Sequence, residues 1–365
     1  MKIAVYAICK NEAKFVSRFA ESAKDADGVF VLDTGSTDET IAELAKTGIT
    51  HRQDVFTPWR FDVARNAALE MVPSDYDACV ILDMDEVLMP GWRTALESHF
   101  KAGATLVQAD YVWAFAEDGK PLLNFYMDRA HLRHGYRWKG ACHENIRAIV
   151  PSNERIVQSD TFKIHHHADP KKSRGQYLAL LITAREEEPY NDRNCYYLAR
   201  EFFNYGRLNE AVGEFKRHIA MPHGWYAERA SSMMHLGICF QKQGDTREAE
   251  RWFMRACTED PDTRKNWLSL AQFYNDLRMW PECYAAAQRA LRVTSRAKVY
   301  LDQANCWGAL PYDLAGTAAW YIGLHAESVT LLSTALQHEP QNERLRGNLA
   351  LCQGLMHDHA SLPST

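Results

Sequence analysis

Long hydrophobic runs are missing from the sequence. No apolar stretch approaches the roughly 18–20 residues that a membrane-spanning helix requires. The first residues, MKIAVYAICKNEAKF, lead directly into a short apolar strand, without the longer apolar core and small-residue cleavage site of a secretory signal. We therefore expect a cytoplasmic chain without a membrane span.

Paired cysteines are missing as well. The nine cysteines are scattered, and none forms a Cys-x-x-Cys pair. Zinc sites and disulfide frameworks both need recurring cysteine spacings. The pattern favours reduced thiols that serve in packing, as is typical of the cytoplasm.

Positive charge is also scarce, since the net charge is -5 and no long basic run occurs. This argues against strong sequence-independent binding to duplex nucleic acid, which requires many phosphate contacts. What the chain does have is length and apolar content, with 365 residues of which 46% are hydrophobic. These values predict a globular protein of two domains.

Strand-like and helix-like segments alternate through the first part of the chain. The predicted strands cover residues 2–9, 28–35 and 78–86, and the predicted helices cover residues 12–26, 37–48 and 61–72. Thr37 or Asp38 is expected to cap the second helix. This order predicts an α/β domain with a mostly parallel sheet and helices on both faces. Ligands of such sheets bind beyond the carboxyl ends of the strands, where polar clusters follow at 10–12, 33–36 and 83–85.

Helical pairs replace this pattern in the rest of the chain. Four segments each contain two helical stretches split by a turn: residues 196–219, 230–261, 267–293 and 314–342. They resemble tetratricopeptide repeats, whose period is near 34 residues, and an ordinary helical domain is the alternative. We predict an α/β domain over 1–190 and an all-α domain over 191–365. The repeats could hold a macromolecular partner on a concave surface or form a homodimer.

Three carboxylates lie within four residues at the end of the third predicted strand, in VILDMDEVLMP. Alternation along a strand places Asp83 and Asp85 on one face and Met84 in the core. Closely spaced carboxylates favour Mg²⁺ or Mn²⁺, and the alternative is a solvated acidic turn. Glu86 is expected only to cap or solvate the turn.

The segment VLDTGSTDET follows the second predicted strand. Asp33 could accept hydrogen bonds from a base or ribose, and the N–H groups at the following helix start suit a phosphate. A strand-to-helix turn with an aspartate cap is the alternative.

Together these motifs resemble the opening of family 2 glycosyltransferases, which have the GT-A fold. The stretch ICKNEAKFVSRFAESAKDADGVFVLDTGSTDETI carries the KNE-like and DTGSTD turns of that family, WRFDVARNAALE resembles its ARN helix, and LDMDE its D-x-D site. The four motifs occur in the expected order within residues 1–90. The resemblance extends more loosely through the repeats, because bacterial and phage proteins join this catalytic domain to tetratricopeptide-like helices.

The resemblance implies a role for each motif. Glu12 and Asp33 would contact the nucleotide base and ribose. The pocket around them would be shaped by Asn11, Thr34, Gly35, Ser36 and Asp38. Arg65 and Asn66 would approach the nucleotide or its phosphates, although Arg65 could instead be a surface ion-pair partner.

The resemblance also implies a Mn²⁺ or Mg²⁺ ion. Asp83 would contact the ribose and the metal, and Asp85 the metal directly. A histidine commonly supplies a third ligand in such domains, and FKIHHHADPKKSRGQYLALL offers His165, His166 and His167. We favour His167, with His166 second. The basic residues that follow could neutralise a diphosphate or form a solvated turn: Lys171, Lys172 and Arg174.

The segment YRWKGACHENI resembles the W-x-G-x-x-HE region of related enzymes. An acceptor hydroxyl is activated by a general base, which an aspartate or glutamate can provide. Glu144 is the first candidate and Asp128 the second, and either could instead belong to a structural ion pair. His143 would orient the acceptor or pack with Trp138.

The expected reaction is metal-assisted transfer of a sugar from a UDP-sugar to an acceptor hydroxyl, and the resemblance implies inversion at the anomeric carbon. The acceptor would be a protein, a saccharide or, as in phage relatives, a hydroxymethylated base in DNA. A basic cluster hints at a polyanionic or sugar acceptor, although an exposed loop is the favoured interpretation: Arg129, Arg133, Arg137 and Lys139. Two rival classes are a non-catalytic repeat scaffold and a nucleotidyltransferase, which would need a basic glycine-rich phosphate loop that AICKNEAKF lacks.

Overall fold

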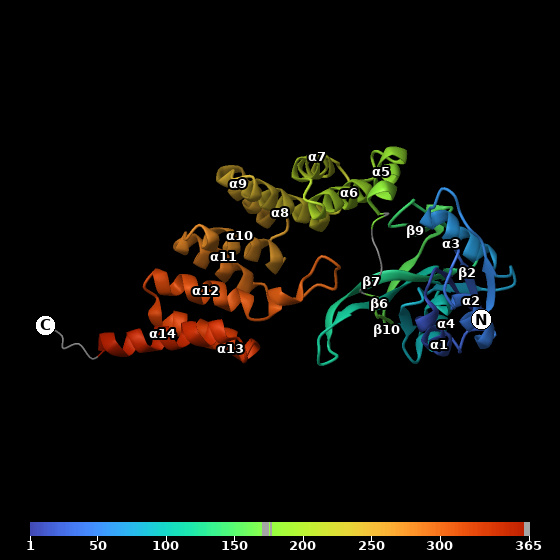
Figure 1. Cartoon of the computed structure of the whole chain (residues 1–365), viewed down its shortest axis with the longest axis horizontal. Coiled ribbons are helices and arrows are strands. Elements are labelled where there is room, and N and C mark those ends of the chain that lie inside the picture. Colours follow the sequence, from blue (N-terminus) through green and yellow to red (C-terminus); the bar gives the residue numbers. More distant parts are fainter. Residues whose placement is uncertain (170–174, 176, 361–365) are drawn as a thin grey trace. The chain divides into compact units, whose positions relative to one another are not determined.

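The computed structural model describes residues 1–169, 175 and 177–360, the last five of these by their backbone alone. The chain divides into two compact units, Met1–Glu187 with Lys298–Tyr300, and Glu188–Ala297 with Leu301–Thr365. Figure 1 shows the sheet of the first unit in blue to green and the helices of the second in yellow to red. The expected division between residues 190 and 191 stays a prediction.

An eight-stranded sheet forms the centre of the first unit. Its strands are β1 (Ile3–Cys9), β2 (Gly28–Asp33), β3 (Thr50–Gln53), β4 (Ala78–Ile81), β5 (Glu86–Leu88), β6 (Leu106–Phe115), β7 (Pro121–Leu132) and β10 (Ile156–His166). Their order across the sheet is β3-β2-β1-β4-β7-β6-β10-β5. The first four run parallel, β10 is parallel to β6, and the remaining pairs are antiparallel. The predicted α/β class with a mostly parallel sheet is confirmed.

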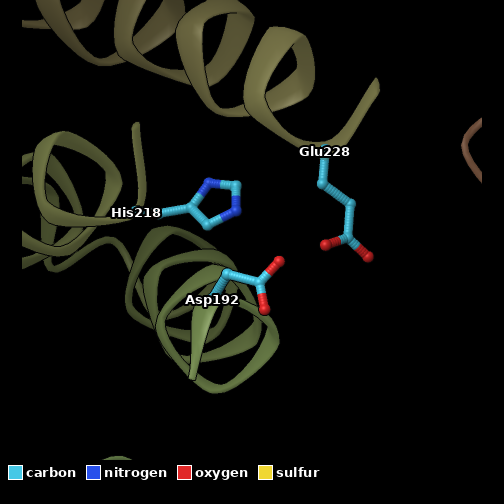
Figure 2. Close-up of side chains that lie close together, drawn as sticks. All are labelled: Asp192, His218 and Glu228. Carbon is cyan, nitrogen blue, oxygen red and sulfur yellow. The ribbon is translucent and has the colours of Figure 1, made fainter. Parts of the chain in front are cut away.

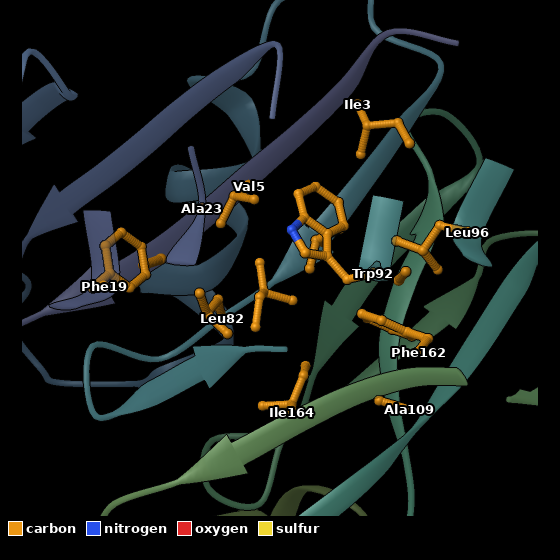
Figure 3. Close-up of a cluster of buried hydrophobic side chains, with 14 of the residues drawn as sticks. Ile3, Val5, Phe19, Ala23, Leu82, Trp92, Leu96, Ala109, Phe162 and Ile164 are labelled. Atoms are coloured by element: carbon orange, nitrogen blue, oxygen red, sulfur yellow. The ribbon is translucent and has the colours of Figure 1, made fainter. Parts of the chain in front are cut away.

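Both faces of the sheet are covered. On one face, α1 (Val16–Ser22), α2 (Thr40–Thr47) and α4 (Trp92–Lys101) contribute to the apolar cluster in Figure 3. On the other face lie α3 (Phe61–Glu70) and a small antiparallel sheet of β8 (Tyr136–Lys139) and β9 (Asn145–Ala148). Alternate residues of β1 enter the two clusters, so the strand is apolar along its whole length because neither of its faces meets water.

Two of the three carboxylates at the end of the third predicted strand, Asp83 and Asp85, are not on a strand, whereas Glu86 begins β5. β4 ends at Ile81, and Asp83, Met84 and Asp85 lie in the connection to β5. Met84 is fully buried, as expected. The alternation argument for its two neighbours was wrong, because the chain turns before it reaches them.

Two of the three predicted helices start later than expected, whereas α3 begins at Phe61 as predicted. The segment predicted as one helix over 12–26 is a 3-10 turn (Ala13–Phe15) followed by α1. α2 begins at Thr40 and its N-cap residue is Glu39, so the expected cap at Thr37 or Asp38 was wrong, although Thr40 N donates to Asp38 Oδ1 at 3.0 Å. A short acidic side chain that bonds its own backbone competes with the first helical turn and delays it.

A buried hydrogen-bond chain joins β1, β7 and β8. Trp138 Nε1 donates to the Tyr6 hydroxyl at 2.8 Å, and Tyr6 lies 2.9 Å from His131 Nε2. His131 Nδ1 lies 2.7 Å from the Leu132 carbonyl, which can only accept, so Nδ1 carries the proton and Nε2 accepts from Tyr6. Burial lowers the pKa of His131 to about 4 and keeps the ring neutral. The three polar side chains are therefore satisfied without a charge inside the core.

Antiparallel helix pairs make up the second unit. The helices are α6 (Asp192–Asn204), α7 (Leu208–Ile219), α8 (Tyr226–Lys242), α9 (Thr246–Glu259), α10 (Arg264–Asp276), α11 (Trp280–Arg292), α12 (Leu310–Tyr321), α13 (His325–His338) and α14 (Glu343–Ala360). Each of the four predicted hairpins is present as a pair, α6 with α7 through α12 with α13, and consecutive helices also pack together. The tetratricopeptide-like arrangement is confirmed. The preceding α5 (Tyr177–Glu187) belongs to the first unit.

Close packing within these pairs depends on small residues. A Cβ atom added to Gly237 of α8 would lie 2.8 Å from the ring of Phe253 in α9. A Cβ atom added to Gly316 of α12 would lie 2.9 Å from Leu332 in α13. In both pairs the large residue follows the glycine by sixteen positions, so the same contact recurs where the sequence repeats.

Two composition-based expectations concern the whole chain. All nine cysteines are buried and none is in a disulfide. Among the described residues, none of the helices combines the length and apolarity needed to cross a bilayer.

Gly237→Ala tests the packing of the helix pairs. The added methyl has no room beside Phe253, and we expect a loss of about 1–3 kcal/mol in the free energy of unfolding, measured by urea denaturation followed by far-UV circular dichroism. Gly213→Ala in α7 is the matched control, because nothing lies within 4 Å of its added Cβ. That control should gain roughly 0.5–1 kcal/mol from helix propensity. Equal effects of the two substitutions would contradict the packing account.

Candidate functional site

The turns after β1 and β2 are tied to each other by side-chain hydrogen bonds. Asn11, at a φ of 55°, donates its N–H to Ser36 Oγ at 2.8 Å and accepts from Thr37 N at 2.7 Å. Glu12 N donates to Thr40 Oγ1 at 2.8 Å. These bonds bring the KNE and DTGSTD motifs together at the carboxyl ends of two adjacent strands.

Asp33 is the centre of this pair of turns. Its carboxylate is fully buried and accepts from Gly35 N at 2.9 Å, Ser36 N at 2.8 Å and Gln53 Nε2 at 2.8 Å, and also from the Ser36 hydroxyl. Burial alone would raise the pKa of Asp33, but the bonds from Ser36 and Gln53 outweigh it and lower the pKa. Thr34 turns its hydroxyl to the Cys9 carbonyl at 3.0 Å.

The N–H groups near the start of α2 serve carboxylates and amides of the protein. Gly35 and Ser36 donate to Asp33, and Thr37 donates to Asn11. The expectation that these donors suit a phosphate is not supported by the geometry, because each already has an acceptor.

Arg65 of α3 lies between two carboxylates from distant parts of the chain. Its Nη1 donates to Asp83 Oδ1 at 2.8 Å and its Nε to Glu144 Oε1 at 2.6 Å. The guanidinium also lies over the Trp138 ring, 4.9 Å from its centroid. Arg65 is buried, so the alternative of a surface ion pair was wrong. The ion pair places the metal-motif aspartate and the first candidate base on one cation.

Ionisation of this trio follows from its burial. Burial opposes the charge of Arg65, but Asp83 and Glu144 outweigh it and raise the pKa of the guanidinium. Burial also raises the pKa of Glu144, and Arg65 only partly offsets it. Glu144 thus combines a fixed position with a greater proton affinity than an exposed glutamate has.

Glu86 is the most deeply buried carboxylate of the cluster. Its side chain is 1% exposed and accepts from Arg129 Nη2 at 2.5 Å and from the Tyr111 hydroxyl at 2.6 Å. The other oxygen accepts from Asp83 N at 2.8 Å. The expectation of a capping role was therefore correct, whereas that of solvation was wrong.

Arg129 and Tyr111 were missed as members of the site. Arg129 was expected in an exposed loop as part of a basic cluster, but it lies on β7 and is 3% exposed. Its Nη1 is 3.8 Å from Asp83 Oδ2. The sequence signal that could have identified both residues is their place on strands that face the interior. Tyr111 lies on β6 and Arg129 on β7, and these strands are antiparallel neighbours. Arg133 instead donates to the Val72 carbonyl at 2.6 Å.

His166 is the histidine that approaches Asp85. Its Nε2 is 3.7 Å from Asp85 Oδ2, while its Nδ1 is 3.2 Å from the Trp113 carbonyl, to which it must donate. The ring stacks on Trp113, with 4.5 Å between centroids. Burial would lower the pKa of His166, but Asp85 and the Trp113 carbonyl outweigh it and raise the pKa.

The other two histidines have different surroundings. His165 lies edge-on to Phe115 at 5.0 Å and the His167 ring stacks on Phe115 at 5.6 Å. His167 meets Asp85 through its backbone, where its N–H donates to the Asp85 carbonyl at 2.8 Å. The geometry thus reverses our order of preference. The basic residues 171, 172 and 174 lie outside the described residues.

Asn66 and Asp128 serve the scaffold in this structure. Asn66 Nδ2 donates to the Trp138 carbonyl and its Oδ1 accepts from Trp138 N, both at 3.0 Å. Asp128 accepts from Gln108 Nε2 at 2.8 Å and from Arg147 Nη1 at 2.9 Å. Asp128 shares no described contact with Asp83, Asp85 or Glu144, so Glu144 is the carboxylate that the structure brings to the cluster.

Known proteins resemble each of the two units separately. Residues 4–157 match the family model described as glycosyl transferase family 2. A search of curated proteins finds no match.

Several solved helical proteins resemble part of the chain. YrrB, titled "a TPR protein with an unusual peptide-binding site", is 13% identical, with 48% of this chain and 82% of that chain covered and a TM-score of 0.37. TTC0263 of Thermus thermophilus is 19% identical, with 49% and 91% covered and a TM-score of 0.33. PilF of Pseudomonas aeruginosa is 12% identical, with 47% and 72% covered and a TM-score of 0.39. At these scores the likenesses add nothing to the argument.

Arg65→Met tests whether one guanidinium holds the cluster together. Two partly buried carboxylates would lose their shared cation, and we expect a loss of about 3 kcal/mol in the free energy of unfolding by urea denaturation, at the low end for a broken buried pair because Asp83 is 28% exposed. Adding Glu144→Gln to Arg65→Met should recover part of that loss, since one of the uncompensated charges is then removed. Arg52→Met is the control, because Arg52 forms an exposed ion pair with Asp54 and should change stability by no more than about 0.5 kcal/mol. A loss in Arg65→Met as small as in the control would contradict the bridging role.

Proposed function

The chain carries a family 2 glycosyltransferase domain, and we propose that this domain transfers a sugar from a UDP-sugar to an acceptor hydroxyl with the help of a divalent cation. The observation that carries the proposal is that Arg65 pairs with both Asp83 and Glu144 at the end of β4, where Asp85 faces His166, beside the joined turns after β1 and β2. Ligands of α/β sheets bind at this edge.

The charge of the cluster supports a cation. Among the described residues, Asp83, Glu86 and Glu144 pair with the guanidinium groups of Arg65 and Arg129, and Asp85 faces His166. Carboxylates gathered this closely at a largely buried site are costly unless cations or protons compensate them. Carboxylate and imidazole donors suit Mn²⁺, and carboxylates also suit Mg²⁺.

We assign the ligands as Asp83, Asp85 and His166, with His167 now second among the histidines. A cation bound there would act as a Lewis acid toward the diphosphate of the donor. His166 suits this role because the Trp113 carbonyl holds its Nδ1 proton and leaves Nε2 directed at Asp85.

The nucleoside would lie against the turns that Asp33 organises. Asn11, Thr34, Gly35, Ser36 and Asp38 fix the shape of these turns. Direct contact of Asp33 with a base would require displacement of the Ser36 hydroxyl, so we infer that Asp33 acts mainly by holding the turn, and that Glu12 is the carboxylate that contacts the ligand. Asn66 positions β8 through Trp138 rather than meeting a phosphate.

Glu144 is the proposed general base, and inversion at the anomeric carbon follows if it activates the acceptor for direct displacement. Its proton would come from the attacking hydroxyl. A raised pKa favours this task, and Arg65 keeps the carboxylate in one orientation. Buried cysteines outside disulfides also suit the cytoplasmic location that we propose.

Calorimetry with UDP tests the cation site. In Mn²⁺, we expect UDP to bind wild type at least roughly tenfold more tightly than Asp85→Asn or His166→Gln, with the difference abolished by chelator. His165→Gln is the matched control, since the ring of His165 lies against Phe115, and it should bind as wild type does. Equal affinities in all proteins, with and without Mn²⁺, would sink the metal role. A loss in His167→Gln instead of His166→Gln would restore the sequence-based order.

The base assignment is tested by turnover of UDP-glucose, UDP-galactose and UDP-N-acetylglucosamine, with products on copurifying protein, saccharide and DNA identified by mass spectrometry. We expect Glu144→Gln to lower turnover about 10²–10⁴-fold. Because a base works only when deprotonated, wild-type turnover should fall as the pH drops through a pKa above the ordinary 4.5 of glutamate, and this limb should be absent from Glu144→Gln. Asp128→Asn is the control. Full turnover in Glu144→Gln would place the base elsewhere.

A further inference from the structure

Three potential metal ligands meet at one end of the first helices of the second unit. They are Asp192, the first residue of α6, His218, next to last in α7, and Glu228, in the first turn of α8. Because α6, α7 and α8 run alternately up and down, the start of α6, the end of α7 and the start of α8 fall at the same end. Sequence spacing alone gives no sign of the group, since its members are spread over three separate helices.

The three functional groups point into a common space, as Figure 2 shows. One donor atom from each residue lies within 4.8 Å of the other two. Ligands of a tetrahedral zinc ion with bonds of about 2.0–2.1 Å would stand roughly 3.3 Å apart. The side chains would therefore have to close in by about 1.5 Å at most, which small rotations about their own bonds can supply.

His218 is the independent sign that something binds between them. The residue is 0% exposed, and its Nε2 has no hydrogen-bond partner among the residues that the structure describes. A buried polar nitrogen without a partner costs about 1–3 kcal/mol. Its other nitrogen, Nδ1, lies 2.8 Å from Ser232 Oγ, itself fully buried. A hydroxyl that accepts from Nδ1 leaves the Nε2 lone pair facing the carboxylates, as in metal-bound histidines.

Two arginines lie beside the cluster. Arg193 approaches Glu228 with 3.6 Å between Nη1 and Oε1, longer than a hydrogen bond. Arg229 is directed to Glu259, at 2.9 Å. One imidazole nitrogen and two carboxylates thus give a set of one nitrogen and two oxygen donors.

We propose that Asp192, His218 and Glu228 form a binding site for a first-row divalent cation of the zinc class, which clamps the ends of α6, α7 and α8. Imidazole with carboxylates is a donor set that zinc accepts, and three protein ligands leave a fourth position for water. The site belongs to the helical unit and is separate from the cation site proposed for Asp83, Asp85 and His166. Its role is structural, because it links the first helix pair to the start of the second.

The experiment uses the full chain without an affinity tag, stripped of metal by a chelator and carrying Asp85→Asn and His166→Gln. These two changes weaken the other candidate site, so its success or failure does not decide this one. Co²⁺ is the probe, because its visible absorption reports coordination by the protein. We expect one equivalent of Co²⁺ to bind and Zn²⁺ to displace it. Zn²⁺ at about a hundredfold excess over its Kd should raise the melting temperature by roughly 5–10 °C.

Variants of the same background locate the bound ion. His218→Gln should abolish the Co²⁺ spectrum, and Asp192→Asn should weaken binding at least roughly tenfold. His235→Gln is the matched control, because His235 is a partly buried imidazole of α8 whose Nδ1 is already bonded to the Ser231 carbonyl at 2.7 Å; it should bind Co²⁺ as the background does. If circular dichroism shows that His218→Gln does not fold, Asp192→Asn decides, since its amide keeps the shape of a partly exposed side chain.

Two results would overturn the proposal. One is the absence of both a Co²⁺ spectrum and a Zn²⁺-dependent rise in melting temperature in the background protein. The other is binding of the same strength in Asp192→Asn and in folded His218→Gln. In either case the three residues would be a charge arrangement at helix ends, with acids at two amino termini and a histidine at a carboxyl terminus.

Discussion

The ion pairs of Arg65 are the interaction on which the rest of the first unit's site depends. One guanidinium joins Asp83, in the connection after β4, to Glu144, just before β9. Without it, two partly buried carboxylates would repel each other and either take up protons or move apart. Burying such a trio brings little net stability, because desolvation of three charges cancels most of their attraction. Its presence is better explained by positioning: Arg65 fixes Asp83 and the proposed base Glu144 relative to one strand end, and the Trp138 ring lies against Arg65.

The four carboxylates of the cluster differ because their surroundings differ. Glu86 is closed off by Arg129 and Tyr111 and holds the backbone of Asp83 in place. The side chain of Asp83 keeps 28% of its surface exposed and faces two guanidinium groups. One residue therefore shapes the turn while its neighbours remain able to meet a ligand. Similar carboxylates acquire separate tasks through environment alone, as paired acids do in many active sites.

Much of the first unit's fold and site could be predicted from short sequence motifs. The features that could not be predicted depend on partners far along the chain and on where strands end. The turns after β1 and β2, the helix with Arg65 and the aspartates after β4 are each local patterns, and their order implied one edge of a sheet. The role of Glu86 was misjudged because its partners, Tyr111 and Arg129, lie on antiparallel strands far along the chain. The end of β4 was missed because an apolar run reads as strand for as long as it stays apolar. Among the three histidines, alternation could not identify the one near Asp85, since β10 ends within the run.

The two candidate cation sites share one arrangement of histidine despite their unrelated folds. In each, an oxygen of the protein faces Nδ1, the Trp113 carbonyl for His166 and the Ser232 hydroxyl for His218, and Nε2 is directed at carboxylates. Fixing one nitrogen chooses the tautomer and the ring plane together, so the other nitrogen is ready for a ligand without further reorganisation. The two sites differ in the surroundings of the other ring nitrogen, Nε2. Nε2 of His166 has Asp85 within 3.7 Å and can carry a proton there, whereas Nε2 of His218 has no hydrogen-bond partner among the described residues. A proton can therefore stand in for a cation at the first site, while the buried second site gains more from a bound ion.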